Sequence, residues 1–353
     1  EIKGYDAEEL TYIFKKYWRL EDTYKNYTKK SNFKNSCNHL EHLLKKSLSK
    51  HLISDRKIGL FLSGGTDSNA LLNLISQNFS KKKLNTFTYG FKNASNYDES
   101  DRVSKLLTNS KNIDNFSTYL KPNEIIDNFE KVTQILESPF TSIRIFAMKK
   151  LYELARKKGC KVILEGDGGD EVFGGYDYNV FSYLKDKFHN EKSNKSKIVD
   201  YLKKFVEASG RNKSHIINLI LTNNYQFSST SDGTIFVNSD FFKETFLNQN
   251  ISENFYEHNR IKKLNFLKNS QLKDINYIKL PRSLKYKDRL SMSVGIETRV
   301  PLLDHKLAEY CFNLPNKYKF KGDISRYIFK SVAKKKYLTK YKFEVSKKTI
   351  ADP

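Results

Sequence analysis

The feature that most constrains this fold is a glycine-rich turn, Ser63-Gly64-Gly65-Thr66-Asp67-Ser68, between an apolar run and a helical pattern. The apolar run, residues 58–62, is typical of a buried strand. After the turn, apolar residues at positions 70–75 recur as they do on one face of a helix. We therefore interpret this stretch as a strand–turn–helix unit.

Strand and helix patterns continue to alternate as far as about residue 180. Further strands are expected at 84–91, 113–119 and 161–164, and helices at 37–51, 98–108, 123–136 and 142–158. Such alternation indicates a parallel, doubly wound sheet with right-handed crossovers. The fold class is therefore predicted as α/β, with a mostly helical C-terminal part over residues 181–353.

The first turn has the chemistry of a phosphate cradle. Gly64 and Gly65 let the backbone turn tightly and present N–H groups to an anion, and the following helix aims its positive N-terminus at the same point. Ser63 and Ser68 add hydroxyl donors. Asp67 repels phosphate unless a cation lies between them, which indicates Mg2+. The turn does not follow the GxxxxGK[ST] pattern of the Walker A loop.

A second glycine-rich turn, Glu165-Gly166-Asp167-Gly168-Gly169-Asp170-Glu171, follows the strand at 161–164. Its clustered carboxylates repel one another in a plain turn, but they suit Mg2+ bound to a polyphosphate. Binding sites in parallel sheets lie at the carboxyl ends of the strands, where both turns are expected. A calcium loop or a plain turn is the alternative, although the spacing does not follow D-x-[DN]-x-[DN]-G.

Charge and cysteine content narrow the class of protein. Lys and Arg exceed Asp and Glu by 63 − 40 = +23, an excess that suits a nucleic-acid partner. Because the lysines are spread along the whole chain, we favour a solvated lysine surface and expect no nucleic acid. The three cysteines lack a CxxC pair and favour a reducing, cytoplasmic compartment. No apolar run reaches about 18 residues, so no membrane span is expected.

Taken together, the two turns resemble those of the asparagine synthetase B family, the glutamine-hydrolysing asparagine synthases. The first resembles the SGGxDS PP-loop of the ATP pyrophosphatase superfamily, and residues 165–176, EGDGGDEVFGGY, resemble the family's second loop. Further segments match in the family's order: Tyr17–Leu20, Leu52–Asp55, Tyr97–Glu99, Ser142–Arg144, Asp288–Met292 and Gly295–Asp304. The resemblance implies a HUP-like synthetase domain.

The resemblance also implies which residues bind the cofactors, ATP and Mg2+. The pyrophosphate portion of ATP would be held by Ser63, Gly64, Gly65, Asp67 and Ser68. Other ATP contacts would come from Phe61 and Tyr89 at the adenine end, and from Glu165 and Gly166. Mg2+ would be carried by Asp67 and Asp170.

Two positions are expected to be catalytic. Asp167 matches an acidic position tied to forming the acyl-adenylate and to its capture by ammonia. Lys347 matches the lysine that closes over the nucleotide, with Lys348 as the alternative. A cation at that position offsets the charge that grows on the departing pyrophosphate.

Two arginines in the matched C-terminal segments each have two possible roles. Arg289 or Arg299 could bind a substrate carboxylate through a bidentate fork. The other reading is a structural salt bridge with Asp288, Glu297 or Asp304.

The resemblance implies a division into domains. Residues 1–36 would be a linker from a missing N-terminal glutaminase domain, because residue 1 is Glu and not the catalytic Cys of that domain. Residues 37–353 would form the synthetase domain. Within it we expect a nucleotide-binding α/β core at 37–180, a variable helical insert at 181–275 and a helical part at 276–353 that completes the active site.

The implied reaction is the ATP-dependent conversion of aspartate to asparagine through β-aspartyl-AMP, by a ligase that forms AMP and pyrophosphate. Ammonia would come from glutamine or from solution, and a homodimer is an expected assembly. Three alternatives stay open: an amidotransferase acting on another carboxylic acid, a tRNA-modifying PP-loop enzyme, and a non-catalytic nucleotide-binding module. Retention of Asp67 and Asp170 argues against the module.

Overall fold

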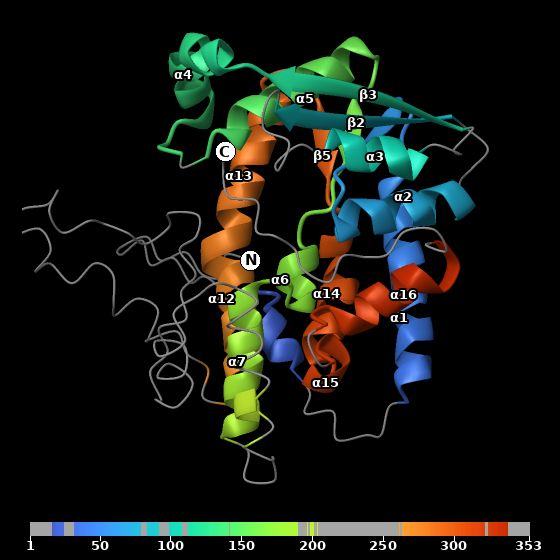
Figure 1. Cartoon of the computed structure of the whole chain (residues 1–353), viewed down its shortest axis with the longest axis vertical. Coiled ribbons are helices and arrows are strands. Elements are labelled where there is room, and N and C mark those ends of the chain that lie inside the picture. Colours follow the sequence, from blue (N-terminus) through green and yellow to red (C-terminus); the bar gives the residue numbers. More distant parts are fainter. Residues whose placement is uncertain are drawn as a thin grey trace, which may run out of the picture.

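A parallel five-stranded sheet organises the chain (Figure 1). A computed structural model describes residues 16–24, 32–78, 83–91, 99–107, 112–140, 142–189, 196, 198–200, 203, 261, 263–321 and 324–337. The strands are β1 (Ile58–Phe61), β2 (Leu84–Phe91), β3 (Ile113–Leu120), β4 (Val162–Leu164) and β5 (Glu297–Arg299). They pair in the order β3-β2-β1-β4-β5, every pair parallel, which confirms the predicted fold class.

Strand β5 is the strand of this sheet that sequence analysis does not predict. It lies at the edge of the sheet and pairs in register with β4, so that Thr298 lies opposite Ile163. A strand of three residues carries too little alternation to stand out in a region whose patterns are helical. Its extended form therefore depends on pairing with β4.

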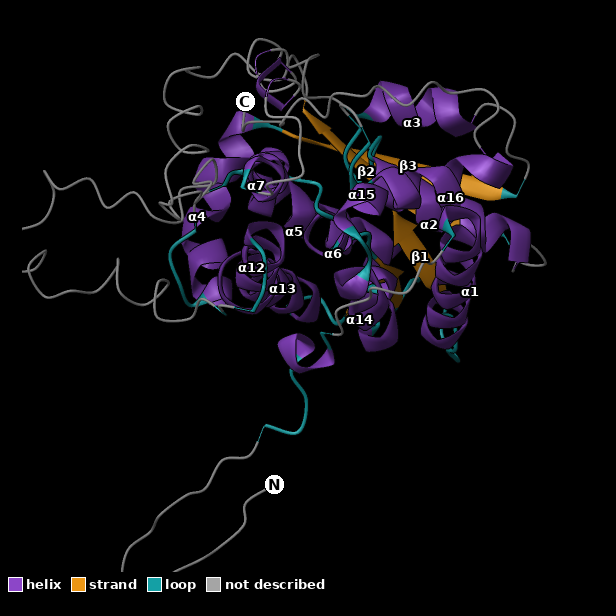
Figure 2. Ribbon diagram, turned by 90° about the horizontal axis from the view of Figure 1, so that it is seen from below, coloured by secondary structure: helices purple, strands orange, loops and turns teal. Residues whose placement is uncertain are grey.

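Helices cover both faces of the sheet (Figure 2). They are α1 (Phe33–His51), α2 (Thr66–Asn78), α3 (Ser100–Leu107), α4 (Pro122–Leu136), α5 (Arg144–Lys157), α6 (Gly169–Phe173), α7 (Asp177–Phe188), α12 (Phe266–Lys273), α13 (Lys279–Met292), α14 (His305–Asn313), α15 (Asn316–Lys319) and α16 (Tyr327–Tyr337). Leu60 and Leu164 face an apolar cluster with α1, α2, α14 and α16, whereas Ile163 faces a second cluster with α4, α5 and α13. Successive strand residues point to opposite faces, so both faces are buried.

Helix α1 begins at Phe33, earlier than the expected residue 37, because Asn32 caps it. The Asn32 side chain accepts the backbone N–H of Lys34 at 2.9 Å. Upstream, a short helical turn at Leu20–Thr23 buries Leu20 in a small apolar cluster with Phe312. Part of the segment that we expect to be a linker therefore packs against the helices.

A continuous helical run at residues 266–292 passes along the sheet toward the second turn. It comprises α12, a π-helical turn at Asp274–Ile278, and α13. Helix α12 packs beside α7, and α13 packs against α4, α5 and β5 (Figure 1). Tyr178 Oη of α7 donates to Asp274 Oδ2 at 2.8 Å and fixes the π-helical turn. Among the described residues, no helix has the length and apolar character needed to cross a membrane.

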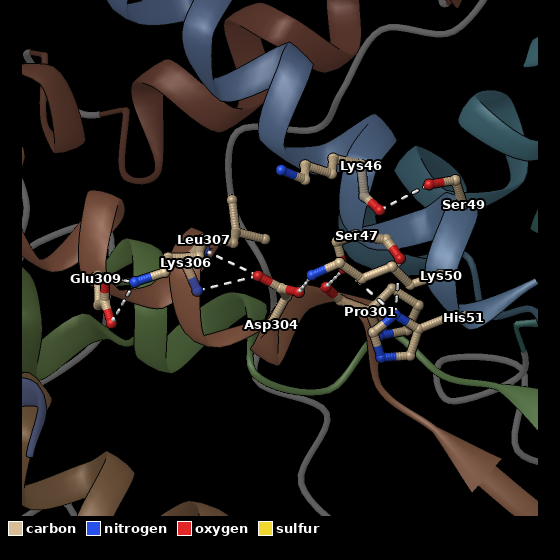
Figure 3. A network of polar contacts seen from close by, with 10 residues as sticks. All are labelled: Lys46, Ser47, Ser49, Lys50, His51, Pro301, Asp304, Lys306, Leu307 and Glu309. Atoms are coloured by element: carbon tan, nitrogen blue, oxygen red, sulfur yellow. Dashed lines mark hydrogen bonds and ion pairs between the residues drawn. The ribbon is translucent and has the colours of Figure 1, made fainter. Parts of the chain in front are cut away.

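The matched segment Gly295–Asp304 braces α1 against α14 (Figure 3). Asp304 caps α14 by accepting two backbone N–H groups, and Lys50 of α1 donates to the same carboxylate at 2.9 Å. Ser47 Oγ donates to the carbonyl oxygen of Pro301 at 2.6 Å. The Asp304 carboxylate and the Pro301 carbonyl oxygen, both drawn in Figure 3, therefore hold helices together.

Candidate active site

The two glycine-rich turns meet at the carboxyl ends of the neighbouring strands β1 and β4. A methyl group on Gly166 would come within 3.0 Å of the backbone nitrogen of Ser68. A methyl group on Gly169 would come within 2.6 Å of a carboxylate oxygen of Asp67. Glycine permits this close approach because it has no Cβ, and the two turns therefore form one site.

The first turn forms an ordered cradle at the N-terminus of α2. Ser68 Oγ donates to the carbonyl oxygen of Ser63 at 3.0 Å and accepts the N–H of Ser63 at 3.1 Å. The N–H of Gly65 donates to Ser63 Oγ at 3.2 Å. The first N–H groups of a helix have no partner within the helix, so they suit an anion. The structure brings the five predicted phosphate-binding residues together, and their binding of ATP stays a prediction.

Asp67 and Asp170 converge on one cation, the guanidinium of Arg326. Its Nη1 lies 2.8 Å from both carboxylate oxygens of Asp67 and 2.7 Å from Asp170 Oδ1. Burial by itself lowers the pKa of Arg326, but the two carboxylates outweigh burial and raise it, so the side chain stays charged. The φ of Arg326 is +54°, in the left-handed region that non-glycine residues seldom adopt.

The same two carboxylates fit the Mg2+ that the sequence analysis expects. Carboxylate oxygens are the hard donors that Mg2+ prefers, and these two already share one positive centre. In the described part of the chain, no group of three or more His, Cys, Asp and Glu side chains could hold a metal ion. The remaining ligands would therefore be phosphate oxygens and water, the usual partners of Mg2+ in phosphoryl chemistry. Because Arg326 lies where the carboxylates converge, Mg2+ would compete with it.

Glu165 and Asp167 share a second cation, Lys287 of α13. Lys287 Nζ donates to Glu165 Oε2 at 2.5 Å and also to Asp167 Oδ2. Tyr152 Oη of α5 donates to the other oxygen of Glu165 at 2.5 Å. Burial raises the pKa of Glu165, and Lys287 opposes this rise. Both Glu165 oxygens are used within the protein, so a contact of Glu165 with ATP would come from its backbone.

The two predicted adenine-end residues lie at neighbouring strand ends. Phe61 closes β1 and pairs in register with Phe87, and Tyr89 follows two residues later on β2. The Phe61 ring lies 4.8 Å from the ring of Tyr152, centroid to centroid. Phe61 therefore connects the carboxyl end of β1 to the Glu165 network, while the adenine contact itself stays a prediction.

Arg289 and Arg299, for which two roles were open, both form salt bridges. Arg299 pairs with Glu297 at 2.6 Å and donates to two backbone carbonyl groups at the end of α1. Arg289 pairs with Glu137 at 2.6 Å, an acid that sequence analysis does not propose because it lies far away in the chain, directly after helix α4. The structure therefore favours the salt-bridge reading for both.

The sequence analysis does not predict three residues of the site: Tyr152, Lys287 and Arg326. Lys287 directly precedes the matched segment Asp288–Met292, and this position in the chain is a local signal for a site residue. Tyr152 belongs to an ordinary helical pattern, and Arg326 is a single arginine in a lysine-rich stretch, so neither has a local signal. The predicted closing lysines lie outside the described residues: Lys347 and Lys348.

Gly168→Ala is expected to destabilise the chain by about 2 kcal/mol. Gly168 has a φ of +88°, and a methyl group there would overlap the side chain of Leu303. Gly159→Ala is the matched control, because Gly159 has a φ of +81° but no atom within 4 Å of an added methyl group. Urea unfolding measures both variants. Equal losses would contradict the packing of Leu303 against the second turn.

Comparisons with known proteins place this chain beside asparagine synthetases. The asparagine synthase family model matches residues 39–353. Asparagine synthetases [glutamine-hydrolyzing] 1 and 3 of Bacillus subtilis (strain 168) are 26% and 23% identical over 88% and 85% of this chain. A putative asparagine synthetase [glutamine-hydrolyzing] 2 of Methanocaldococcus jannaschii is 33% identical over 48% of this chain.

The matches cover 50%, 45% and 32% of the length of those three relatives, in the order given, so the chain spans half or less of each. The family model, in contrast, covers nearly the whole chain. It includes both glycine-rich turns, Lys287 and Arg326. The chain therefore belongs to the asparagine synthase family.

Proposed function

We propose that this chain is an ATP-dependent amide ligase that converts aspartate to asparagine and forms AMP and pyrophosphate. The observation that carries the proposal is the convergence of Asp67 and Asp170, from two turns, on a single positive charge. Such a pair beside a helix N-terminus suits Mg2+ and polyphosphate. The names of the relatives support asparagine as the product.

The proposed chemistry has two steps. The β-carboxylate of aspartate attacks the α-phosphorus of ATP, which forms β-aspartyl-AMP and releases pyrophosphate. The backbone N–H group of Gly64 and the first N–H groups of α2 would bind and orient the pyrophosphate portion. Asp67 and Asp170 would hold Mg2+, which would offset negative charge on the leaving group. Ammonia then attacks the acyl carbon, and AMP leaves.

We infer that ammonia reaches this site from a glutaminase domain of a longer polypeptide or from solution. The relatives are named as glutamine-hydrolysing, and this chain matches half or less of their length. The stretch at residues 17–20, which resembles the family's segment before the synthetase domain, supports the first source. Amide formation by this chain with ammonium chloride, compared with glutamine, tests whether the site can use ammonia from solution.

Exchange of labelled pyrophosphate into ATP tests the proposed function most directly. With Mg2+ present and ammonia absent, we expect exchange that depends on aspartate and that glutamate does not support. Asp170→Asn is expected to lower the exchange rate by about 100-fold or more, because charge stabilisation of the leaving group is weakened. Exchange that depends on a different carboxylic acid would show that this acid, and not aspartate, is the substrate. No exchange with any acid would overturn the proposed ligase activity.

A further inference from the structure

Lys287 connects Asp167, which is expected to be catalytic, to Glu165, which serves as an anchor. Glu165 is that anchor, because its side chain is only 3% exposed and its two oxygens are held by Tyr152 and Lys287, from the neighbouring helices α5 and α13. Asp167 is more open, with 18% of its side chain exposed. The lysine therefore joins a buried acid to a more exposed one.

The side chains around Asp167 carry more negative than positive charge. Two carboxylates share one ammonium, and the phenol of Tyr152 stays neutral because burial, followed by the charge of Glu165, raises its pKa well above the ordinary value. Burial lowers the pKa of Lys287, but Asp167 and Glu165 together raise it, so the lysine stays protonated. Asp288, the exposed next residue on α13, adds a further negative charge nearby.

One oxygen of Asp167 stays available for chemistry. Lys287 holds Oδ2, while Oδ1 has no hydrogen-bond partner among the described residues. A carboxylate held by one oxygen has a fixed orientation, and its second oxygen can accept a proton from a bound amine. Lys287 is held by two acids, so it can fix the orientation of Asp167. A lysine that points into solvent cannot do so.

We propose that Lys287 is a positioning residue that orients Asp167 so that Asp167 Oδ1 receives a proton during the amide-forming step. The inference rests on the proposed function and deepens it. In this step the ammonia nitrogen forms a bond to the acyl carbon, and the bond between that carbon and the AMP oxygen breaks. One proton passes from nitrogen to Asp167 Oδ1, AMP leaves with the electron pair, and the amide remains. Adenylation precedes this proton transfer and does not need it.

Lys287→Met separates the two half-reactions. We expect amide formation with ammonium chloride to fall by roughly 100-fold, the usual contribution of a positioned proton acceptor, and pyrophosphate exchange to fall much less. Lys287→Arg keeps a cation that can hold both acids, so it is expected to recover amide formation at least partly. A structural role alone would lower both half-reactions together.

Lys285→Met is the matched control, because Lys285 is exposed on the same helix two residues away. We expect it to leave both half-reactions at the wild-type rate, and thermal unfolding checks that each variant is folded. Equal loss of exchange and amide formation in Lys287→Met, or no recovery in Lys287→Arg, would overturn the positioning role. Absence of exchange in the wild-type chain is a separate result, since it would overturn the proposed function and this role with it.

Discussion

Arg326→Leu is expected to destabilise the chain by about 3–5 kcal/mol, because it leaves two partly buried carboxylates facing each other without a cation. The Arg326 side chain is 4% exposed, and those of Asp67 and Asp170 are 16% and 12% exposed. Water therefore offsets little of the repulsion. Urea unfolding in Mg2+-free buffer gives the change in the free energy of unfolding directly.

Two controls separate charge from packing at this position. Asp67→Asn and Asp170→Asn introduced together into the Arg326→Leu chain should recover much of the loss, because the repelling charges are gone. Mg2+ should raise the melting temperature of Arg326→Leu more than that of the wild-type chain, since the metal no longer competes with the guanidinium. A loss below about 1 kcal/mol, or no recovery in the triple variant, would contradict the ionic account.

Glu171 is expected to make the chain less stable as the pH rises from 4.5 to about 8. Burial, followed by the charge of Asp170, raises the pKa of Glu171 from 4.5 to about 8 in the folded chain. Its stabilising contribution is fully present below pH 4.5, where both states are protonated, and is lost as the pH rises through the folded pKa. For a shift of this size the loss is on the order of 4 kcal/mol.

Glu171→Gln removes this titration and keeps an oxygen that can accept the hydrogen bond from Tyr176 Oη, which is 2.5 Å long. The free energy of unfolding of the wild-type chain, minus that of the variant, should therefore decrease between pH 4.5 and pH 8. Glu130→Gln, on the exposed side of α4, serves as the control for the glutamate-to-glutamine change itself. Urea titrations at a series of pH values, without Mg2+, make the comparison. A flat difference for Glu171→Gln would show that the carboxyl is already ionised in the folded chain.

Local patterns in the sequence are enough to predict the elements around the two turns. Strand β2 has the predicted bounds, and β1, β3, β4, α4 and α5 lie within a few residues of theirs. These elements are visible because a buried strand and an amphipathic helix each repeat their apolar residues over a distance that a short window covers. The two turns are equally local, so Asp67, Asp167 and Asp170 can be chosen as site residues from the sequence alone.

The tertiary structure decides which charges meet in that site. Arg326 reaches Asp67 across 259 positions of the chain, and Lys287 reaches Asp167 across 120. No local repeat encodes such distances, because they depend on how α13 and the segment before α16 pack against the sheet. The same holds for β5, which becomes a strand by pairing with β4. The sequence by itself determined the α/β framework and the acids of the two turns, since both are short-range patterns. Packing alone decided which cation holds each acid, since long-range contacts select the partner.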